Sequence, residues 1–214
     1  MLGELRTTTG VYVAVGASDA VGVGARRPGR QAWPRLLHRQ VFGRATRFVN
    51  LAVSGATVAE ALAEQVPRAE RLEPDLVTVW LVVNDVVAGV PPERYEADLD
   101  ELVARLRRGG ATRVLVGNCP YLDRLPAYLT WRALGLAPEP DEANGLVDRY
   151  NAAVEAVTVR HDAELVDLRA AGLAARRAGV EAELFAADGF HPSTAGHRAL
   201  AATFAAAVAR MPES

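Results

Sequence analysis

Short apolar runs alternate along this chain with longer stretches whose apolar residues recur at helical spacing. The runs predict five β-strands, at residues 11–15, 46–52, 76–83, 113–117 and 164–168. The intervening stretches predict helices at residues 33–42, 57–66, 93–108, 142–160, 169–178 and 194–210. The most apolar run, Leu76–Val83, is typical of a strand covered on both faces. The pattern therefore predicts an α/β fold, a three-layer α/β/α sandwich around a parallel five-stranded sheet.

Local signals fix several of these helix ends. Thr57 with Glu60 three residues later is a capping-box signature, and Pro67 is expected to stand at the end of that helix. Ser193 or Thr194 is expected to cap the last helix.

The chain length of 214 residues predicts a single domain over residues 1–214, with residues 1–10 as a loose lead-in. Residues 118–141 interrupt the alternation with a long connection rich in proline and large apolar residues. The spacing of Leu125, Tyr128 and Leu129 indicates a helical turn with one apolar face. This segment is expected to form a lid or pocket wall. The alternative is a packed excursion that covers one edge of the sheet.

Charge and composition exclude several classes of function. The chain has 24 basic and 26 acidic residues and a net charge of −2, so it lacks the excess of positive charge that is typical of nucleic-acid-binding proteins. All the basic residues are arginine, and the absence of lysine excludes P-loop lysine chemistry and lysine-bound pyridoxal phosphate. The Gly- and Arg-rich stretch from Gly22 to Arg30 lacks the spacing of a nucleotide-binding fingerprint. No cofactor is expected.

Cysteine and histidine spacing predicts neither a disulfide nor a metal site. The single cysteine, Cys119, is expected to be a small buried filler, and the six-residue separation of His191 and His197 matches no zinc motif. The first ten residues show no apolar core of a signal peptide, and no apolar run of 18 residues occurs. The sequence thus predicts a cytoplasmic protein without a membrane span, and it does not indicate an oligomeric state.

Polar residues and glycines follow four predicted strand ends, at Ser18, Gly55, Asn84 and the pair Asp188 and His191. In an open α/β sheet the carboxyl ends of the strands form the ligand-binding edge. A serine hydrolase needs a nucleophile, a base, a group that orients the base and donors for the oxyanion. Simpler interpretations remain open: Ser18 as a helix cap, Asn84 as a turn residue, and Asp188 with His191 as an ion pair at a helix entry.

From residue 11 to about residue 200 the chain resembles the SGNH hydrolases, also called the GDSL esterase/lipase family. The four matching blocks read Gly16-Ala17-Ser18, Asn50-Leu51-Ala52-Val53-Ser54-Gly55-Ala56-Thr57, Val82-Val83-Asn84-Asp85 and Asp188-Gly189-Phe190-His191. Two positions depart from the family pattern. Ala17 replaces the usual aspartate of the first block, and Val82 replaces the usual glycine of the third, where a side chain can crowd the site or move Asn84.

The resemblance implies a flavodoxin-like sheet and a serine esterase that forms a covalent acyl-enzyme on a small-molecule acyl ester. Ser18 is the implied nucleophile, His191 the general base, and Asp188 the group that orients it. The backbone amides of Ser18 and Gly55 and the side-chain amide of Asn84 are the implied oxyanion hole. The residues expected to line the substrate pocket are Val82, Leu125, Tyr128, Trp131 and Phe190.

Two other functions remain compatible with the sequence. The same apparatus can pass the acyl group to an alcohol, which makes an acyltransferase. A catalytically weak α/β ligand-binding module is the other alternative, supported by Val82 alone.

Overall fold

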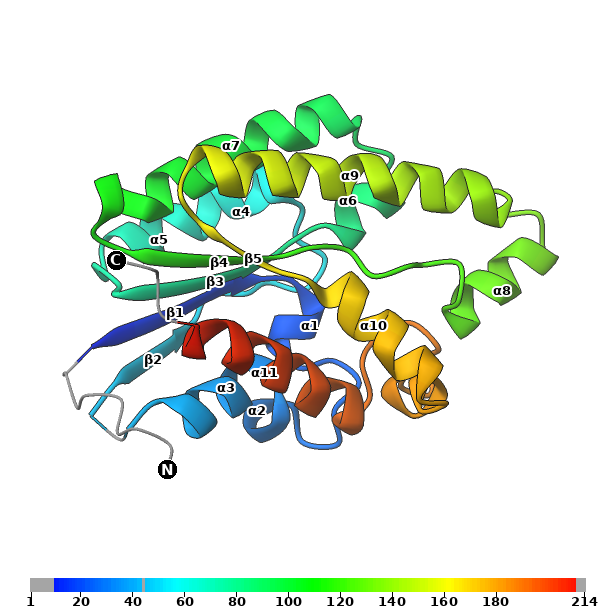
Figure 1. The fold of residues 1–214 in the computed structure, drawn as a ribbon, viewed down its shortest axis with the longest axis horizontal. Helices are drawn as coiled ribbons and strands as arrows, with labels where there is room; N and C mark the ends of the chain where they lie inside the picture. The colour runs from blue at the N-terminus through cyan, green and yellow to red at the C-terminus, as the bar shows by residue number, and fades with distance from the viewer. Residues whose placement is uncertain (1–9, 44, 211–214) are drawn as a thin grey trace.

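The computed structural model describes residues 10–43 and 45–210 and contains a parallel sheet in the strand order β2-β1-β3-β4-β5 (Figure 1). The strands are β1 (Val11–Gly16), β2 (Arg47–Asn50), β3 (Leu76–Trp80), β4 (Arg113–Gly117) and β5 (Glu164–Val166). This confirms the predicted α/β fold with a parallel five-stranded sheet. Of the predicted lead-in, only Gly10 lies within the described residues.

Helices cover both faces of the sheet (Figure 1). On the upper face of that view lie α4 (Val58–Glu64), α5 (Val66–Glu70), α7 (Pro92–Arg107) and α9 (Pro140–Arg160). On the lower face lie α1 (Ser18–Val21), α2 (Pro28–Gln31), α3 (Trp33–Val41), α10 (Leu168–Arg177) and α11 (Thr194–Ala209). Two short helices, α6 (Val83–Val87) and α8 (Pro126–Ala133), follow β3 and β4, and two 3₁₀ turns span Arg108–Gly110 and Glu181–Leu184.

Aromatic pairs fill the core on either side of the sheet. On the lower face the rings of Trp33 and Phe204 stack 4.2 Å apart between α3 and α11. On the upper face Tyr95 of α7 and Tyr150 of α9 have ring centroids 4.8 Å apart. Their burial stabilises the layers because large aromatic side chains remove the most apolar surface from water. The sheet is thereby held as a rigid platform for its loops.

The third strand is shorter than the apolar run predicts. It ends at Trp80 rather than at Val83, and Val83–Val87 forms α6. Beyond Trp80 the ladder with β1 and β4 ends, and the carbonyl of Leu81 accepts a hydrogen bond from the Tyr95 hydroxyl instead, at 2.9 Å. Asn84 therefore lies in the first turn of a helix, not at a strand terminus.

The predicted helix at residues 57–66 is two helices. The capping box of Thr57 and Glu60 is present at the start of α4, as predicted. Pro67, however, lies in the first turn of α5 rather than at a helix end. A proline is compatible with that position because the first amides of a helix have no intrahelical partner. In the last helix, the hydroxyl of Ser193 caps α11.

The loops after β1, β3 and the last 3₁₀ turn meet at the carboxyl edge of the sheet. There α8 and the start of α9 extend past the strands, at the right of Figure 1. None of the helices in the described ranges is long and apolar enough to cross a membrane.

Candidate active site

Ser18 is the first residue of α1, directly after β1 and the N-cap residue Ala17. Only 9% of its surface is exposed. Its hydroxyl does not cap the helix, since α1 has no side-chain cap, and its Oγ lies 3.0 Å from His191 Nε2. The simpler interpretation of Ser18 as a helix cap is therefore wrong.

A tight turn carries Asp188 and His191. Asp188 Oδ1 accepts hydrogen bonds from the amides of Phe190 and His191, at 2.9 and 3.0 Å, and its Oδ2 lies 2.7 Å from His191 Nδ1. With Nδ1 donating to Asp188, Nε2 is the acceptor for the Ser18 hydroxyl. The structure thus aligns Asp188, His191 and Ser18 in one hydrogen-bonded chain.

The carboxyl group of Asp188 is adapted to remain ionised. Partial burial favours its neutral form, but the two backbone amides and His191 outweigh that effect and hold the pKa below its ordinary value. The carboxylate can therefore accept from the imidazole across the neutral pH range.

The glycine-rich loop after α1 packs against this turn. Gly24 has φ of +86°, and a Cβ at this residue would lie 2.3 Å from the carbonyl oxygen of Pro192. The amide of Arg26 donates to Thr194 Oγ1 at 3.0 Å, and His197 Nε2 lies 2.9 Å from the carbonyl of Val23. The loop therefore joins the helix of Ser18 to the turn of His191, a structural role distinct from phosphate binding.

Gly55 and Asn84 lie on two connected loops. Gly55 has φ of +83°, a conformation that favours glycine, and within the described residues nothing accepts a hydrogen bond from its amide. Asn84 Nδ2 donates to the carbonyl of Ala56 at 2.9 Å. One N–H of the Asn84 side chain is thus committed to the Gly55 loop, which leaves the other for a ligand.

Asp85 anchors the same loop from beneath. It is 2% exposed, and its two carboxyl oxygens lie 3.3 and 3.1 Å from the amide of Val58, the first residue of α4. Burial raises its pKa to about 6, although the Val58 amide opposes the shift. Asp85 thus helps hold the loop that presents Gly55.

The cleft beside Ser18 is narrow. It holds about 10 Å³, roughly the room of one water molecule, and Val82, Asn84, Asp19 and Phe190 line it together with Ser18. Val82 is buried and is the N-cap residue of α6, so its side chain fills space that the family glycine would leave open.

A second cavity adjoins this cleft under α8. It holds about 200 Å³ and is lined by Leu125, Tyr128, Trp131, Phe190 and other apolar residues of α6 and α9. Phe190 lines both spaces, with its ring 5.8 Å from Trp131 and 5.0 Å from His191. The amide of Ala127 donates to Gly189 at 3.0 Å, which fixes α8 to the turn of His191. Four of the five expected pocket residues therefore line this cavity: Leu125, Tyr128, Trp131 and Phe190. The fifth, Val82, lines the cleft beside Ser18 instead.

Three site residues escaped the sequence analysis. Gln65 exchanges two hydrogen bonds of 3.0 Å with the backbone of Gly16, and Asn50 Nδ2 donates to the carbonyl of Ala20 at 2.7 Å. Both position the turn around Ser18. Asp19 lines the cleft, and its pKa is raised to about 6 by burial and by Asp188, against the opposing effect of His191. Its place directly after Ser18 was the available signal, because Ser18 and Asp19 line the same cleft.

Neither a metal site nor a reactive thiol accompanies this arrangement. Across residues 10–43 and 45–210, no group of three or more His, Cys, Asp or Glu side chains could hold a metal ion. Cys119 is fully buried, and burial raises the pKa of its thiol.

Comparison with known proteins places the chain in a family context. The profile of the GDSL-like lipase/acylhydrolase family matches residues 14–199. An arylesterase from Vibrio mimicus is 28% identical over 100 residues, which is 46% of this chain and 50% of that protein. The match therefore spans about half the length of that relative.

Solved structures share the fold over nearly the whole chain. LAE5, an alpha/beta hydrolase enzyme from the metagenome of Lake Arreo, Spain, is 27% identical with a TM-score of 0.71, covering 95% of this chain and 97% of that one. Phospholipase A1 from Streptomyces albidoflavus is 22% identical with a TM-score of 0.71, covering 94% and 100% of the two chains. The second likeness concerns the fold alone.

Proposed function

The chain belongs to the GDSL-like lipase/acylhydrolase family, and from that premise we propose that it hydrolyses carboxylic esters with Ser18 as the nucleophile. The observation that carries the proposal is the chain of contacts from Asp188 to His191, at 2.7 Å, and from His191 to Ser18, at 3.0 Å. Such a chain supplies a nucleophile, its base and the group that orients the base.

In the first half of the reaction, Ser18 Oγ attacks the ester carbonyl carbon while His191 Nε2 takes the hydroxyl proton. The carbonyl electron pair moves to oxygen and forms a tetrahedral oxyanion. When the pair returns, the bond to the leaving alkoxide breaks and His191 donates its proton to that oxygen. Water then attacks the acyl carbon while His191 takes its proton. The bond to Ser18 Oγ breaks, His191 returns the proton to that oxygen, and the carboxylic acid is released. Asp188 holds Nδ1–H throughout and stabilises the imidazolium.

Three donors are proposed to stabilise the oxyanion. They are the backbone amides of Ser18 and Gly55 and the second N–H of Asn84 Nδ2. The contact of Asn84 with Ala56 supports this role, because it holds the amide plane in place before the substrate arrives. Such fixed donors are most effective where water is excluded, as in the narrow cleft beside Ser18.

The cavity under α8 is proposed to receive the acyl chain. It meets the cleft at Phe190 and is lined by apolar residues such as Leu125, Tyr128 and Trp131. Burial of each methylene contributes about 0.8 kcal/mol, enough to change kcat/KM severalfold per carbon. The proposed substrates are therefore esters with an aliphatic or aryl acyl group rather than highly charged ones.

A fluorophosphonate that phosphonylates activated serines tests the proposed nucleophile. We expect peptide mapping to place the adduct on Ser18, and Ser18→Ala to lower kcat for p-nitrophenyl butyrate by about 10⁴-fold with an unchanged Tm. Ser54→Ala, on the exposed loop beside Gly55, is the matched control and should retain activity. An adduct on Ser54 or Ser193 would refute the assignment.

The same assay separates hydrolysis from the two alternatives. An acyltransferase would give a new ester in preference to free acid when a small alcohol is added at concentrations far below that of water. A binding module would show neither turnover nor an adduct, while still binding the ester.

A further inference from the structure

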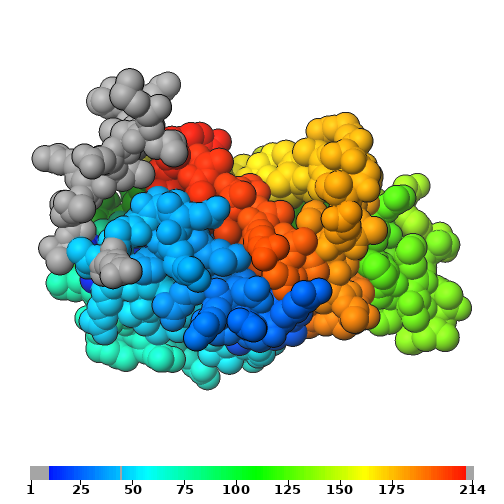
Figure 2. Space-filling view, turned by 90° about the horizontal axis from the view of Figure 1, so that it is seen from below, coloured from blue at the N-terminus to red at the C-terminus, as the bar shows by residue number. Residues whose placement is uncertain are grey.

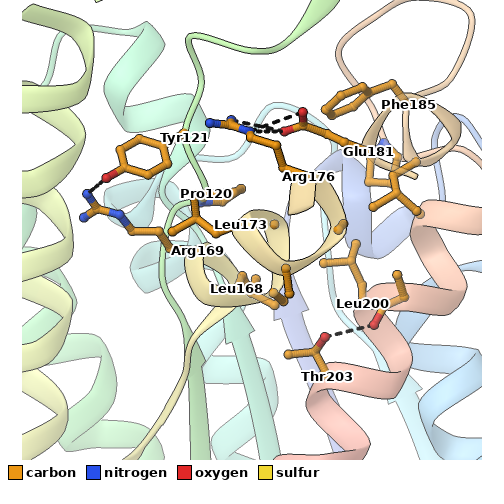
Figure 3. A pocket seen from close by; sticks show the side chains of 18 of the residues that line it. Pro120, Tyr121, Leu168, Arg169, Leu173, Arg176, Glu181, Phe185, Leu200 and Thr203 are labelled. Carbon is orange, nitrogen blue, oxygen red and sulfur yellow. Dashed lines mark hydrogen bonds and ion pairs between the residues drawn. The ribbon is translucent and has the colours of Figure 1, made fainter. Parts of the chain in front are cut away.

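A large apolar cavity lies on the lower face of the sheet, between α10, α11 and the start of the segment that follows β4 (Figure 3). It holds about 450 Å³, against about 200 Å³ for the cavity under α8, and falls in the range of about 300–1,000 Å³ typical of small-molecule sites. Figure 2 shows this face, with α11 lying between α3 and the segment of α10.

The cavity exists because small side chains face one another across it. Ala171, Gly172 and Ala175 of α10 line one side, and Gly196, Ala199 and Thr203 of α11 line the other. Four of the larger apolar residues of the wall are only half-buried: Leu173, Leu184, Phe185 and Leu200. Apolar surface therefore remains available for a ligand with an apolar body.

Charged groups lie along the charged end of the cavity, the upper part of Figure 3, with Arg169 beside Tyr121 and the pair of Arg176 and Glu181 toward Phe185. The guanidinium of Arg169 lies 4.1 Å from the centre of the Tyr121 ring and pairs with Asp148 at 2.5 Å. Glu181 is shared by Arg176, at 3.1 Å, and Arg124, at 4.0 Å. Of the charged residues that line the cavity, Arg169 and Arg176 are positive and Glu181 is negative, so the lining carries one excess positive charge.

The cavity also adjoins the catalytic residues. Trp80 lines both this cavity and the cleft of Ser18, and Pro192, next to His191, forms part of its wall. Behind that wall, the amide of Ser193 donates to Leu184 at 2.7 Å and that of Ala186 to His191 at 2.8 Å. A ligand in the cavity would therefore press against the segment that carries the proposed base.

We propose that this cavity is a second binding site, separate from the one for the reacting ester, and that it takes a single aliphatic chain ending in a carboxylate. The apolar wall suits the chain, and the excess of Arg169 and Arg176 over Glu181 in the lining suits the carboxylate. A free fatty acid of medium length has this chemistry. The site goes beyond the proposed function, and its binding does not require Ser18 to react.

Isothermal titration calorimetry with dodecanoate, below its micelle concentration, tests the site in the Ser18→Ala variant. Adding Ala175→Phe fills the cavity from α10, and we expect it to weaken binding at least tenfold. Ala170→Phe, on the exposed side of the same helix, is the matched control and should bind like the parent. Equal affinities in the two variants would overturn the proposal.

A photoreactive diazirine analogue of dodecanoate gives a readout that needs no cavity variant. Crosslinks within residues 168–176 or 196–203 support the site. Crosslinks confined to α6, α8 and the start of α9 would place the fatty acid in the cavity under α8 alone and overturn it.

The charged end is tested separately with Arg176→Gln in the Ser18→Ala background. We expect this change to weaken dodecanoate about tenfold and leave dodecanol unaffected, while Arg177→Gln, its exposed neighbour with the same change in charge, leaves both unaffected. An equal loss for acid and alcohol would refute the carboxylate assignment. If the variant with Ser18→Ala binds dodecanoate but the parent protein does not hydrolyse esters, the proposed function is refuted and this site is supported. If the parent hydrolyses esters but the variant does not bind dodecanoate, this site is refuted and the proposed function is supported.

Discussion

Three carboxyl groups around the cleft of Ser18 differ in protonation because their surroundings differ. The Asp188 carboxylate accepts hydrogen bonds from two backbone amides and from the His191 imidazole, and these bonds hold its pKa below the ordinary value. Asp19 and Asp85 are penalised chiefly by burial, and the pKa of each is raised to about 6. One of the three groups is thus built to stay charged, while the other two change charge near neutral pH.

Asp19 is expected to influence the pH dependence of the reaction. Its ionised carboxylate stabilises a positive charge on His191, and the protonated imidazole cannot act as base. Asp19→Asn removes a group that changes charge near pH 6, so the kcat/KM profile for a neutral ester should change in shape between about pH 5 and 7. Asp141→Asn, an equal change in charge at the exposed start of α9, is the control. Superimposable acid limbs would show that Asp19 does not act on His191.

Asp85 is expected to reduce stability at alkaline pH. The folded carboxyl keeps its proton up to about pH 6, whereas the unfolded carboxyl loses it near its ordinary pKa of about 3.9. Stability therefore falls as pH rises between these values. Asp85→Asn retains an oxygen acceptor for the Val58 amide without the charge, so its Tm should equal or exceed that of the parent at pH 8, with a smaller advantage at pH 5.

Asp85→Ala is the variant to compare with Asp85→Asn in this prediction. It leaves the buried Val58 amide without an acceptor, a loss of about 1–3 kcal/mol in the free energy of unfolding. Thermal melts at both pH values measure these differences. If the asparagine and alanine variants lose the same stability at pH 8, the carboxylate itself is required and the argument from burial fails.

Among the elements, α8 contributes most to the proposed acyl cavity. Tyr128 and Trp131 line the cavity, whereas Leu129, on the other side of the helix, is 55% exposed. The first turn of the helix is attached at two points: the amide of Ala127 donates to the carbonyl of Gly189, and Tyr128 Oη donates to the carbonyl of Pro138 at 2.7 Å. Its inner face is therefore held at a fixed distance from the turn of His191.

Truncation of that inner face should change substrate preference. Trp131→Ala removes a ring that contacts Phe190, so kcat/KM for p-nitrophenyl octanoate should change at least fivefold relative to p-nitrophenyl acetate. Leu129→Ala should leave the ratio within about twofold of the parent, because its side chain faces solvent. An unchanged ratio in Trp131→Ala, together with a lower Tm, would mean that α8 covers the sheet edge without contacting the substrate.

Sequence periodicity identified the strands and the longer helices because each repeats one local pattern. It failed where a tertiary contact decides the conformation. The apolar run of Leu76–Val83 continues past the strand end because Leu81 and Val82 are buried without being paired in the sheet. Pro67 suits the start of a helix as well as its end, and only the packing of α5 selects between them.

The same division holds for the site. The contacts among Ser18, Asp188 and His191 could be predicted, because the sequence blocks place these residues in loops at one edge of the sheet, although Asp188 and His191 follow a 3₁₀ turn rather than a strand. The roles of Gln65 and Asp85 could not, because they depend on contacts with Gly16 and Val58, 49 and 27 residues away in the sequence. A buried polar side chain that forms hydrogen bonds with backbone groups distant in sequence has no local sequence signature.

Across the whole molecule, two stretches distant in sequence meet behind the proposed triad: the loop of Gly22–Gly24, and the turn of Asp188–His191 with the start of α11 that follows it. His197 lies at their centre. It is fully buried, its Nε2 lies 2.9 Å from the carbonyl of Val23, and its Nδ1 has no partner within the described residues. Burial lowers its pKa despite the contact with Val23, so the ring stays neutral in the folded protein.

His197 is therefore expected to make the fold sensitive to acid. Below about pH 6.5 the unfolded chain takes up a proton at this residue that the folded protein does not, so stability falls by up to about 1.4 kcal/mol per pH unit. His197→Gln keeps an N–H donor for Val23 and does not titrate. Its Tm should fall less between pH 7.5 and 5.5 than that of the parent, by about 3–5 °C. His38→Gln, at a half-buried ring bonded to Thr46, controls for loss of a histidine. If the Tm of His197→Gln and that of the parent fall by the same amount between pH 7.5 and 5.5, the argument is wrong. The folded protein would then bind the proton at His197, and a charged imidazolium would be compatible with the contact between Val23 and α11.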